Sequence, residues 1–440
     1  MLRINNWIRN VSVFLLISYP LVAEETPDSY KSWLNNLNIH QQGALPNAPT
    51  YADYLATMAS NNPEIRELYH QWQSADKQIK VAGAWSDPQL KAGASLQPVV
   101  TAQGPQDLKL GITQAIPRRS EIRSALLMQE QVANAAYANL NSRLNDLNLE
   151  LKYTYADFYL RSQQIAIQKQ TRALLTNWQE VLLTRYRNAA ASYPDLVKTQ
   201  LELISLEDRI RVTEVKVKNI EDELRILLHL DGSSELHSPS SLNTNAEKFE
   251  DINDSWLSNN PSVLIQQSIR SAAKYNEQLT RSKTRPQLLL GLDWTLIGET
   301  DVVNPALKSG EDAFAVNVGI SVPLWRTKNK ASIASAKSNL LAHEAKYAAQ
   351  EHAMELTMEQ TKRDYRDALR RIELLEQNMI PKSQEAYEVL ETAYTAGNAD
   401  ILSLLDSVEN LLKYQLQLEE ARVGLWKVHA RLNHLRGIMQ

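Results

Sequence analysis

The sequence predicts a mainly α-helical fold with a small β part, arranged as two tandem repeats of a helix, a β-hairpin and a long helical hairpin. Three observations predict it: short motifs recur at nearly constant offsets, alternating apolar segments occur in pairs, and a run of 76 residues, 118–193, contains neither Gly nor Pro. The composition, with 43% hydrophobic and 22% charged residues among 440, is typical of a folded protein.

The chain contains one structural unit twice. Asn61-Asn62-Pro63 recurs as Asn259-Asn260-Pro261, 198 residues later. Further pairs keep an offset of 198 or 208, namely Pro88 with Pro286, Gly93 with Gly291, Gly111 with Gly319, Tyr186 with Tyr394 and Leu224 with Leu432. So many anchors at two offsets are not expected by chance. We therefore predict repeat 1 at residues 61–230, a Ser- and Asn-rich linker at 231–258, and repeat 2 at 259–437.

Each repeat contains a pair of predicted β-strands. Apolar residues alternate with small or polar ones over residues 286–297 and 312–322, and more weakly over 88–97 and 106–116. A period of two gives a strand one apolar face, and these lengths are close to the 9–11 residues of a tilted membrane strand. The side chains expected to face lipid are Leu290, Leu292, Trp294, Phe314, Val316 and Val318. A water-soluble sheet packed on a core would show the same alternation.

Two long helical hairpins follow the strands. The predicted helices are residues 118–190 and 195–229 in repeat 1, and 324–396 and 400–436 in repeat 2. Pro381 predicts a kink or break in the third of these. The returning helices carry apolar residues at alternating spacings of three and four, from Leu196 to Leu227 and from Leu404 to Leu435. This spacing predicts a coiled-coil seam, although an ordinary bundle core needs the same residues.

Residues 1–23 have the features of a secretory signal peptide. Arg3 and Arg9 supply the positive start, and Ala23 offers a cleavage site. The alternative is a membrane anchor, but the apolar run over 11–22 is shorter than a bilayer core requires. Residues 24–60 are predicted to form an extended N-terminal segment. No later stretch reaches 18 apolar residues, so we predict no membrane-spanning helix.

Composition and motifs argue against several functions. The chain has no Cys, which excludes disulfides, Cys-based metal sites and a thiol nucleophile. Its formal net charge of −4 implies no sequence-independent affinity for nucleic acid. Of the eight His residues only His429 and His434 lie near each other, and no carboxylate joins them at metal-ligand spacing. We expect no metal site, no cofactor and no enzyme activity, since phosphate-loop, zinc and nucleophile-elbow motifs do not occur.

Four membrane strands are too few to close a barrel. Small closed barrels have at least eight strands, and an open edge in lipid leaves backbone N–H and C=O groups unpaired. A membrane-inserted sheet of this chain therefore requires two, three or four copies, and strand counting does not choose among these numbers. The helices would continue the wall as a tube on the periplasmic side, because a chain with a signal peptide enters the membrane from there.

The chain after residue 23 resembles the TolC-like outer-membrane efflux proteins of Gram-negative bacteria. The features that carry the resemblance are the Asn-Pro start of each repeat, the strand pairs ending near Pro117 and Pro323, the tip pattern Tyr394 to Gly397, and Leu432-x-x-Leu435-x-Gly437. The resemblance implies a homotrimer with a 12-stranded outer-membrane β-barrel and a periplasmic α-helical barrel. It also implies a passive exit duct that receives substrates from a periplasmic adaptor (membrane fusion) protein and an inner-membrane pump of the RND type. Residues 114–119 are most similar to the branch that serves heavy-metal pumps.

The resemblance also implies where the duct narrows. The expected gate residues, at the helical tips, are Asp406, Ser403, Asp400, Tyr394, Asp195 and Arg185. Three copies of Asp406 would form an acidic ring that attracts cations. The residues expected to contact the adaptor are Tyr186, Ala189, Ser192, Gly397 and Asn398, with Ala189 where the family has Gly. Simpler roles are also open: helix caps for Asp195 and Asp400, packing for Tyr394, and a solvated surface position for Arg185.

Two classes of protein without a pore are the alternatives. A periplasmic adaptor would carry one helical hairpin flanked by small β domains. A structural coiled-coil protein would not need the alternating segments at 286–297 and 312–322. Repetition of a whole unit together with its strands favours the duct, and nothing in the sequence identifies the cargo.

Overall fold

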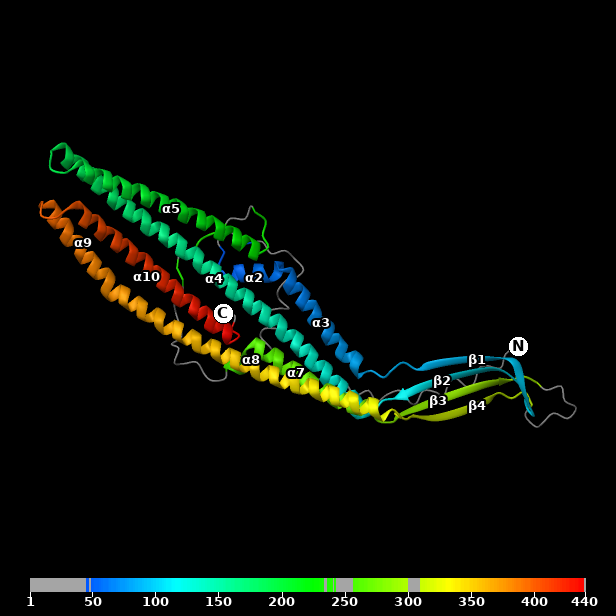
Figure 1. Cartoon of the computed structure of the whole chain (residues 1–440). Helices are drawn as coiled ribbons and strands as arrows, with labels where there is room; N and C mark the ends of the chain where they lie inside the picture. Colours follow the sequence, from blue (N-terminus) through cyan, green and yellow to red (C-terminus); the bar gives the residue numbers. More distant parts are fainter. Residues whose placement is uncertain are drawn as a thin grey trace.

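The structure is a computed structural model that describes residues 45–46, 49–232, 236–239, 241–242, 256–299 and 309–438. The signal peptide expected at 1–23 lies outside these ranges. The described part is elongated, with a four-stranded sheet at one end and the turns of two helical hairpins at the other (Figure 1). Within it, no helix combines the length and the apolar character that crossing a membrane requires.

Repeat 1 supplies the first half of the sheet and the first helical hairpin. Its elements are α2 (Tyr51–Asn61), α3 (Pro63–Gly83), β1 (Gln89–Thr101), β2 (Gly104–Ile116), α4 (Arg119–Arg187) and α5 (Tyr193–Leu227). The 69 residues of α4 correspond to about 100 Å of helix. Helices α3, α5, α7 and α10 all pack against α4, so it is the central support of the molecule.

Repeat 2 supplies the second half of the sheet and the second hairpin. Its elements are α6 (Trp256–Asn259), α7 (Pro261–Lys283), β3 (Gln287–Ile297), β4 (Ala313–Ser321), α8 (Arg326–Leu374), η3 (Leu375–Met379), α9 (Ile380–Thr395) and α10 (Ile401–Leu435). Helix α6 begins inside the stretch expected to be a linker, 231–258, and ends at the first residue of the predicted repeat 2. Every element of repeat 1 from α3 onward has a counterpart here, which is the architecture predicted from the repeated motifs.

The expected extended segment at 24–60 is wrong for its last ten residues, which belong to α2. The Thr50 backbone N–H donates to Asp53 Oδ2 at 2.8 Å and caps the helix. Tyr54 and Met58 of α2 are fully buried, so packing on the rest of the fold stabilises a helix too short to persist alone.

The first β-hairpin is longer than expected. The strands predicted at 88–97 and 106–116 leave Gly104 and Pro105 between them, but these two residues pair with Thr101 and Val100 as the first residues of β2. Gly104 has a φ of 135°, and a Cβ there would meet the Gly298 carbonyl oxygen at 1.9 Å. Only glycine fits this position. The β1–β2 register also shifts after Ala94, an irregularity that lets the longer strands stay paired.

The long outgoing helix of repeat 2 is interrupted close to Pro381. Proline has no backbone N–H to donate to the carbonyl four residues earlier. The helix widens into the π-helical turn η3 and resumes as α9, with Pro381 in the first turn of α9. The helix expected over 324–396 therefore consists of three segments and continues in the same general direction (Figure 1).

The sheet joins the two repeats. All neighbouring strands are antiparallel, in the order β1-β2-β3-β4, and the β2–β3 pair links repeat 1 to repeat 2. The register places apolar residues side by side: Leu110 pairs with Trp294, which pairs with Phe314. Among the described residues, β1 and β4 each have one neighbouring strand, so no described strand covers the two outer edges of the sheet.

The recurring Asn-Asn-Pro motif connects the start of each repeat to its end. In repeat 1, Asn62 Oδ1 accepts from the Glu64 N–H at 2.8 Å and Asn61 Nδ2 donates to the Leu228 carbonyl at 3.2 Å. In repeat 2, Asn260 alone both accepts from the Val263 N–H and donates to the Leu435 carbonyl. The motif is thus a clamp between the first helix and the end of the returning helix.

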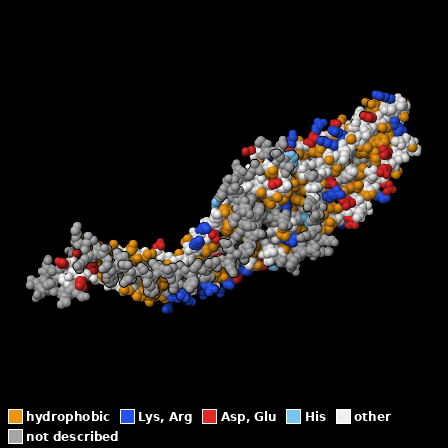
Figure 2. All heavy atoms as spheres, turned by 180° about the vertical axis from the view of Figure 1, so that it is seen from behind, with side chains coloured by type: hydrophobic (Ala, Val, Ile, Leu, Met, Phe, Trp, Pro, Cys, Tyr) orange, Lys and Arg blue, Asp and Glu red, His pale blue; other side chains and the backbone are white. Residues whose placement is uncertain are grey.

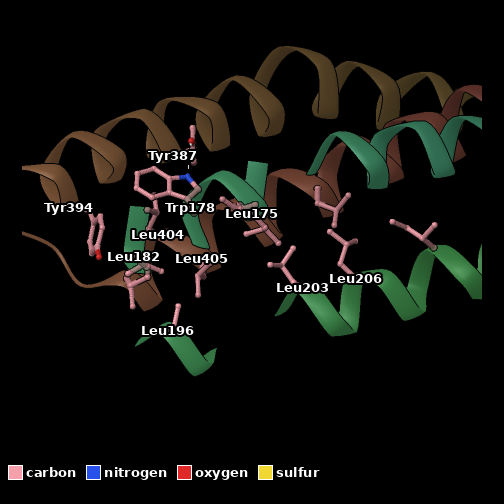
Figure 3. Close-up of a cluster of buried hydrophobic side chains, with 14 residues drawn as sticks. Leu175, Trp178, Leu182, Leu196, Leu203, Leu206, Tyr387, Tyr394, Leu404 and Leu405 are labelled. Atoms are coloured by element: carbon pink, nitrogen blue, oxygen red, sulfur yellow. Dashed lines mark hydrogen bonds between the residues drawn. The ribbon is translucent and has the colours of Figure 1, made fainter. Parts of the chain in front are cut away.

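The helices enclose two main apolar cores. One lies halfway along the molecule, where α2 and α3 meet α4 and α5, around Tyr54, Leu144 and Leu224. The other lies near the helical tips, where α4, α5, α9 and α10 converge around Trp178 and Leu404 (Figure 3). Burial of most of the seam positions of α5 and α10 confirms the predicted stripes. The positions that are only partly covered are Val217, Leu227, Leu411, Tyr414, Leu425 and Val428.

Candidate functional site

One face of the sheet is apolar and open. The six side chains expected to face lipid share this face in the β3–β4 register. Their exposed fractions are 40% for Leu290, 58% for Leu292, 39% for Trp294, 79% for Phe314, 74% for Val316 and 68% for Val318. A contiguous apolar surface of this kind is unfavourable in water and marks a contact with lipid or another protein.

The opposite face of the sheet is polar. Lys109 on β2 forms an ion pair with Asp293 on β3, with 3.0 Å between Nζ and Oδ2, and Asn317 Nδ2 on β4 donates to the same oxygen at 2.8 Å. A Cβ on Gly111 would come within 2.5 Å of Asp293 Oδ1, so this recurring glycine makes room for the carboxylate. The sheet therefore separates an apolar side from a hydrated one.

The two hairpin turns at the far end have the same backbone design. Ala189 and Gly397, 208 positions apart, both follow a helix in the left-handed conformation, with φ of 56° and 80°. In each turn the next residue donates its N–H to a carbonyl five residues back, at 2.8 Å: Ala190 to Arg185, and Asn398 to Ala393. These are Schellman-type ends, and they reverse the chain within a few residues.

The acidic residues of the turns cap the returning helices. Ser192 and Asp195 cap α5 reciprocally: the Ser192 N–H donates to Asp195 Oδ2 at 3.1 Å, and the Asp195 N–H to Ser192 Oγ at 3.3 Å. Asp400 Oδ1 accepts from the Ser403 N–H at 2.8 Å, which with the Ser403 hydroxyl holds the Asp400 pKa below its ordinary value. These three gate candidates, Asp195, Asp400 and Ser403, are therefore engaged in helix capping.

Arg185 and Tyr394 connect the two hairpins. Arg185 Nη1 on α4 donates to the Tyr394 carbonyl at 2.9 Å, and its guanidinium lies 4.7 Å from the centre of the Tyr394 ring. Tyr394 is 7% exposed, and burial raises the pKa of its hydroxyl. Its ring meets Trp178 edge-on at 5.8 Å (Figure 3). Among the gate candidates, the structure therefore brings two pairs into contact. Arg185 and Tyr394 meet across the two hairpins, and Asp400 and Ser403 meet in the cap of α10.

Asp406 stands apart from these contacts. It is exposed, one turn beyond Ser403 on α10, and its carboxylate has no hydrogen bond or ion pair with a described residue. With Lys382 of α9 and Asn410 of α10 it lines a groove of about 380 Å³ between the two helices. The Asp406 carboxylate is therefore open to solvent.

The five residues expected to contact an adaptor, Tyr186, Ala189, Ser192, Gly397 and Asn398, are in or beside the two turns. All five are exposed, and Asn398 also donates its backbone N–H to the Ala393 carbonyl within the turn. The turn side chains do not belong to the buried seams, so changes there leave the core intact.

Sequence inspection missed two contacts that support the tips. Trp178 Nε1 on α4 donates to the Tyr387 hydroxyl on α9 at 3.3 Å, and both side chains are buried. Arg209 on α5 forms an ion pair with Glu409 on α10 at 3.5 Å. Neither pair is marked by a repeat offset or a motif. The tryptophan in an otherwise aliphatic helix face was the available signal for the first pair.

No group of three or more His, Asp or Glu side chains is arranged to hold a metal ion in the part of the chain that the structure describes. His434 instead contacts Asp146, with 2.7 Å between Nε2 and Oδ1. The His429 ring packs edge-on against Tyr365, and burial lowers its pKa. The two histidines that are near in sequence thus have separate structural contacts.

Comparison with known families and structures identifies this architecture. Residues 253–437 match the model of the outer membrane efflux protein family. The match covers repeat 2. No curated protein matches the sequence at a significant level. The family is one of channels and transport proteins and not a class of enzymes.

Solved structures extend the likeness to both repeats. The outer membrane protein VceC from Vibrio cholerae is 17% identical with a TM-score of 0.71, over 88% of this chain and 96% of its own. CusC is 15% identical with a TM-score of 0.74, over 90% and 96%. The open state of the MtrE outer membrane channel from Neisseria gonorrhoeae is 16% identical with a TM-score of 0.67, over 88% and 89%. At these identities the likeness establishes the fold, including the β strands and helical hairpins of repeat 1.

Proposed function

We propose that this protein is the outer-membrane exit duct of a tripartite efflux system. Three copies would join their sheets into a 12-stranded barrel in the outer membrane of a Gram-negative bacterium, with the helices forming a long periplasmic tunnel. The duct would conduct, without catalysis, substrates received from an inner-membrane pump of the RND type and a periplasmic adaptor. No cofactor is required for passive conduction.

The observation that carries the proposal is the incomplete sheet. Its apolar face is exposed, and its edges β1 and β4 have backbone groups that need partners. Lipid would cover the apolar face, and β4 of one copy pairing with β1 of the next would satisfy the edges. The polar face with Lys109, Asp293 and Asn317 would then line the water-filled interior. The match of repeat 2 to the outer membrane efflux protein family and the similarity to the fold of known outer membrane channels support the same assembly.

The helical tips are the proposed gate and the proposed adaptor surface. Arg185 and Tyr394 join the two hairpins and would have to separate if the hairpins move apart. Asp406, exposed near the tips, would contribute one carboxylate per copy to an acidic ring that attracts cations. The exposed turns around Ala189 and Gly397 would receive the adaptor.

The assembly is tested by membrane fractionation, comparison of heated and unheated gels, and planar-bilayer recordings of the purified protein. We expect outer-membrane fractionation, a heat-sensitive trimer band and discrete single-channel conductance. A soluble periplasmic monomer without conductance would instead favour an adaptor-type or structural coiled-coil protein.

The gate is tested with Asp406→Ala. Loss of the carboxylate ring should weaken block by multivalent cations about tenfold or raise single-channel conductance. Asp222→Ala is the matched control, because Asp222 is an exposed acidic residue on α5, near the end of the helix away from the tips. Unchanged block and conductance in the Asp406 variant would remove this residue from the gate.

The cargo is tested in cells. The similarity of residues 114–119 to the heavy-metal branch predicts that a deletion strain becomes sensitive to metal ions. Sensitivity to dyes and antibiotics without sensitivity to metals would assign the duct to drug export.

A further inference from the structure

The helical end of the sheet carries a band of basic side chains, which we call the basic collar. Its members are Arg118, Arg119, Arg123, Lys283, Arg285, Arg326, Lys328 and Lys330. All eight are exposed, and none forms an ion pair with a described residue. Figure 2 shows Lys and Arg side chains gathered along the edge of the molecule where the sheet meets the helices.

The sheet topology brings these residues together from three separate parts of the sequence. They flank the junctions of β2 with α4, of α7 with β3, and of β4 with α8. Ile116 pairs with Leu288 and Gln287 pairs with Ser321, so all three junctions lie at the same end of the sheet, where the strands meet the helices. Arg118 Nη2 also donates to the Pro286 carbonyl at 2.8 Å, which ties two junctions directly.

The opposite end of the sheet has the opposite charge. In its described residues, 101–107, 297–299 and 309–313, the charged side chains are Asp107, Glu299, Glu311 and Asp312. The collar segments 117–123, 280–286 and 323–330 contain a single acidic residue, Glu121. The basic charge is therefore a local feature of the helical end of the sheet, because the whole chain has a net charge of −4.

Large apolar side chains accompany the collar. Leu324 is 76% exposed and Trp325 is 77% exposed, and Trp85, near the start of β1, is 55% exposed. Leu324, Trp325, Arg326, Thr327 and Lys328 together line a surface hollow of about 680 Å³. Indole rings favour the boundary between lipid tails and headgroups, and Lys and Arg bind phosphate oxygens there. The N-termini of α4 and α8, at Arg119 and Arg326, add favourable dipole ends for an anion.

We propose that the basic collar binds anionic phospholipid headgroups of the leaflet on the helical side of the sheet. The inference rests on the proposed insertion of the sheet in a membrane. The exposed apolar face would contact the acyl chains and the collar the phosphates, so that the contact sets how deeply the sheet sits.

The test uses the mature protein in vesicles that contain both phosphatidylcholine and phosphatidylglycerol. In one set of vesicles the phosphatidylglycerol is brominated, and in the other set part of the phosphatidylcholine is brominated. Bromine quenches tryptophan fluorescence at short range, and Trp85 and Trp325 are exposed at the collar. We expect brominated phosphatidylglycerol to compete for the protein surface about threefold better than brominated phosphatidylcholine at low salt, falling toward parity at high salt.

Matched variants locate the effect. R119Q/R326Q/K328Q should abolish the threefold preference, whereas R172Q/R211Q/K216Q, which removes as many exposed charges from α4 and α5, should retain it. Equal quenching by both lipids, or an equal loss in both variants, would overturn the collar as a lipid site. Loss of the preference on addition of millimolar glycerol phosphate would also overturn it, in favour of a site for small phosphates.

Conductance in bilayers of neutral lipid separates this proposal from the proposed function. A wild-type protein that conducts but shows no lipid preference contradicts the lipid site alone. A protein that neither conducts nor enters vesicles contradicts the duct, and the lipid site with it.

Discussion

Repeat 1 and repeat 2 place the same elements in the same order, but they end and support their helices with different residues. Ala189 and His229 adopt positive φ at the ends of α4 and α5, and glycines 397 and 437 stand at the corresponding ends of α9 and α10. Trp178 and Lys152 are buried on α4, whereas the residues 208 positions later, Ala386 and Gln360, are exposed. The same topology therefore accepts different residues at its helix ends and different buried groups. What the two repeats keep in common is the position of the helix ends and of the apolar seams.

The largest expected effect on stability comes from replacing Trp178 with alanine, the residue that repeat 2 has at the corresponding position 386. Trp178→Ala removes a buried indole that packs on Tyr394 and donates to Tyr387, so we expect a loss of about 3–5 kcal/mol of unfolding free energy. Denaturant unfolding of the detergent-solubilised protein, followed by the helical circular-dichroism signal, measures it. Ala386→Gly is the control at the exposed counterpart, with a loss near 1 kcal/mol expected. Equal losses would show that the two positions are equivalent after all.

The second effect concerns Lys152, which is 7% exposed beside the Tyr51 ring. Burial lowers its pKa to about 8, from an ordinary value of 10.5. Between these values the unfolded chain binds the proton that the folded chain releases, so stability should rise with pH, by on the order of 2–3 kcal/mol. Lys152→Gln, which copies Gln360 of repeat 2, should flatten that rise. A pH profile that is the same in wild type and variant would contradict the burial effect.

A third test compares alanine substitutions at the ends of the two returning helices, α5 and α10. Gly437→Ala should cost about 2 kcal/mol, because a Cβ in the left-handed conformation is strained and would meet the Asn259 carbonyl oxygen at 2.8 Å. His229→Ala should change stability by less than about 0.5 kcal/mol, since a Cβ is already accommodated there. Thermal midpoints of both variants under one condition decide the matter. A large loss at residue 229 alone would reverse the assignment of strain.

The smallest expected effect is a gain. Ala189→Gly gives the first tip the residue of the second tip and relieves a left-handed alanine, for about 0.5–1 kcal/mol of added stability. Ala190→Gly, the adjacent control outside the left-handed conformation, should be neutral or slightly destabilising. If both variants behave alike, the alanine at the first tip carries no measurable strain.

Much of the architecture was predictable because it repeats local patterns. Alternation of apolar residues identified all four strands, and the spacing of three and four identified the buried stripes of α5 and α10. Pro381 marked the interruption at η3. Among the candidate gate residues, the capping roles of Asp195 and Asp400 followed from their positions at the starts of the returning helices. The gate role of Asp406 and the adaptor contacts stay predictions, because they depend on neighbouring copies and partners.

The sequence by itself determined the doubled unit, the strand faces and the helix ends, since each depends on residues a few positions apart. Only the tertiary structure decided which distant residues meet. Arg185 reaches Tyr394, Lys109 reaches Asp293, and the basic collar gathers from three junctions because the antiparallel sheet and the paired hairpins bring them together. α2 forms for the same reason: its buried side chains gain their packing from helices far along the chain.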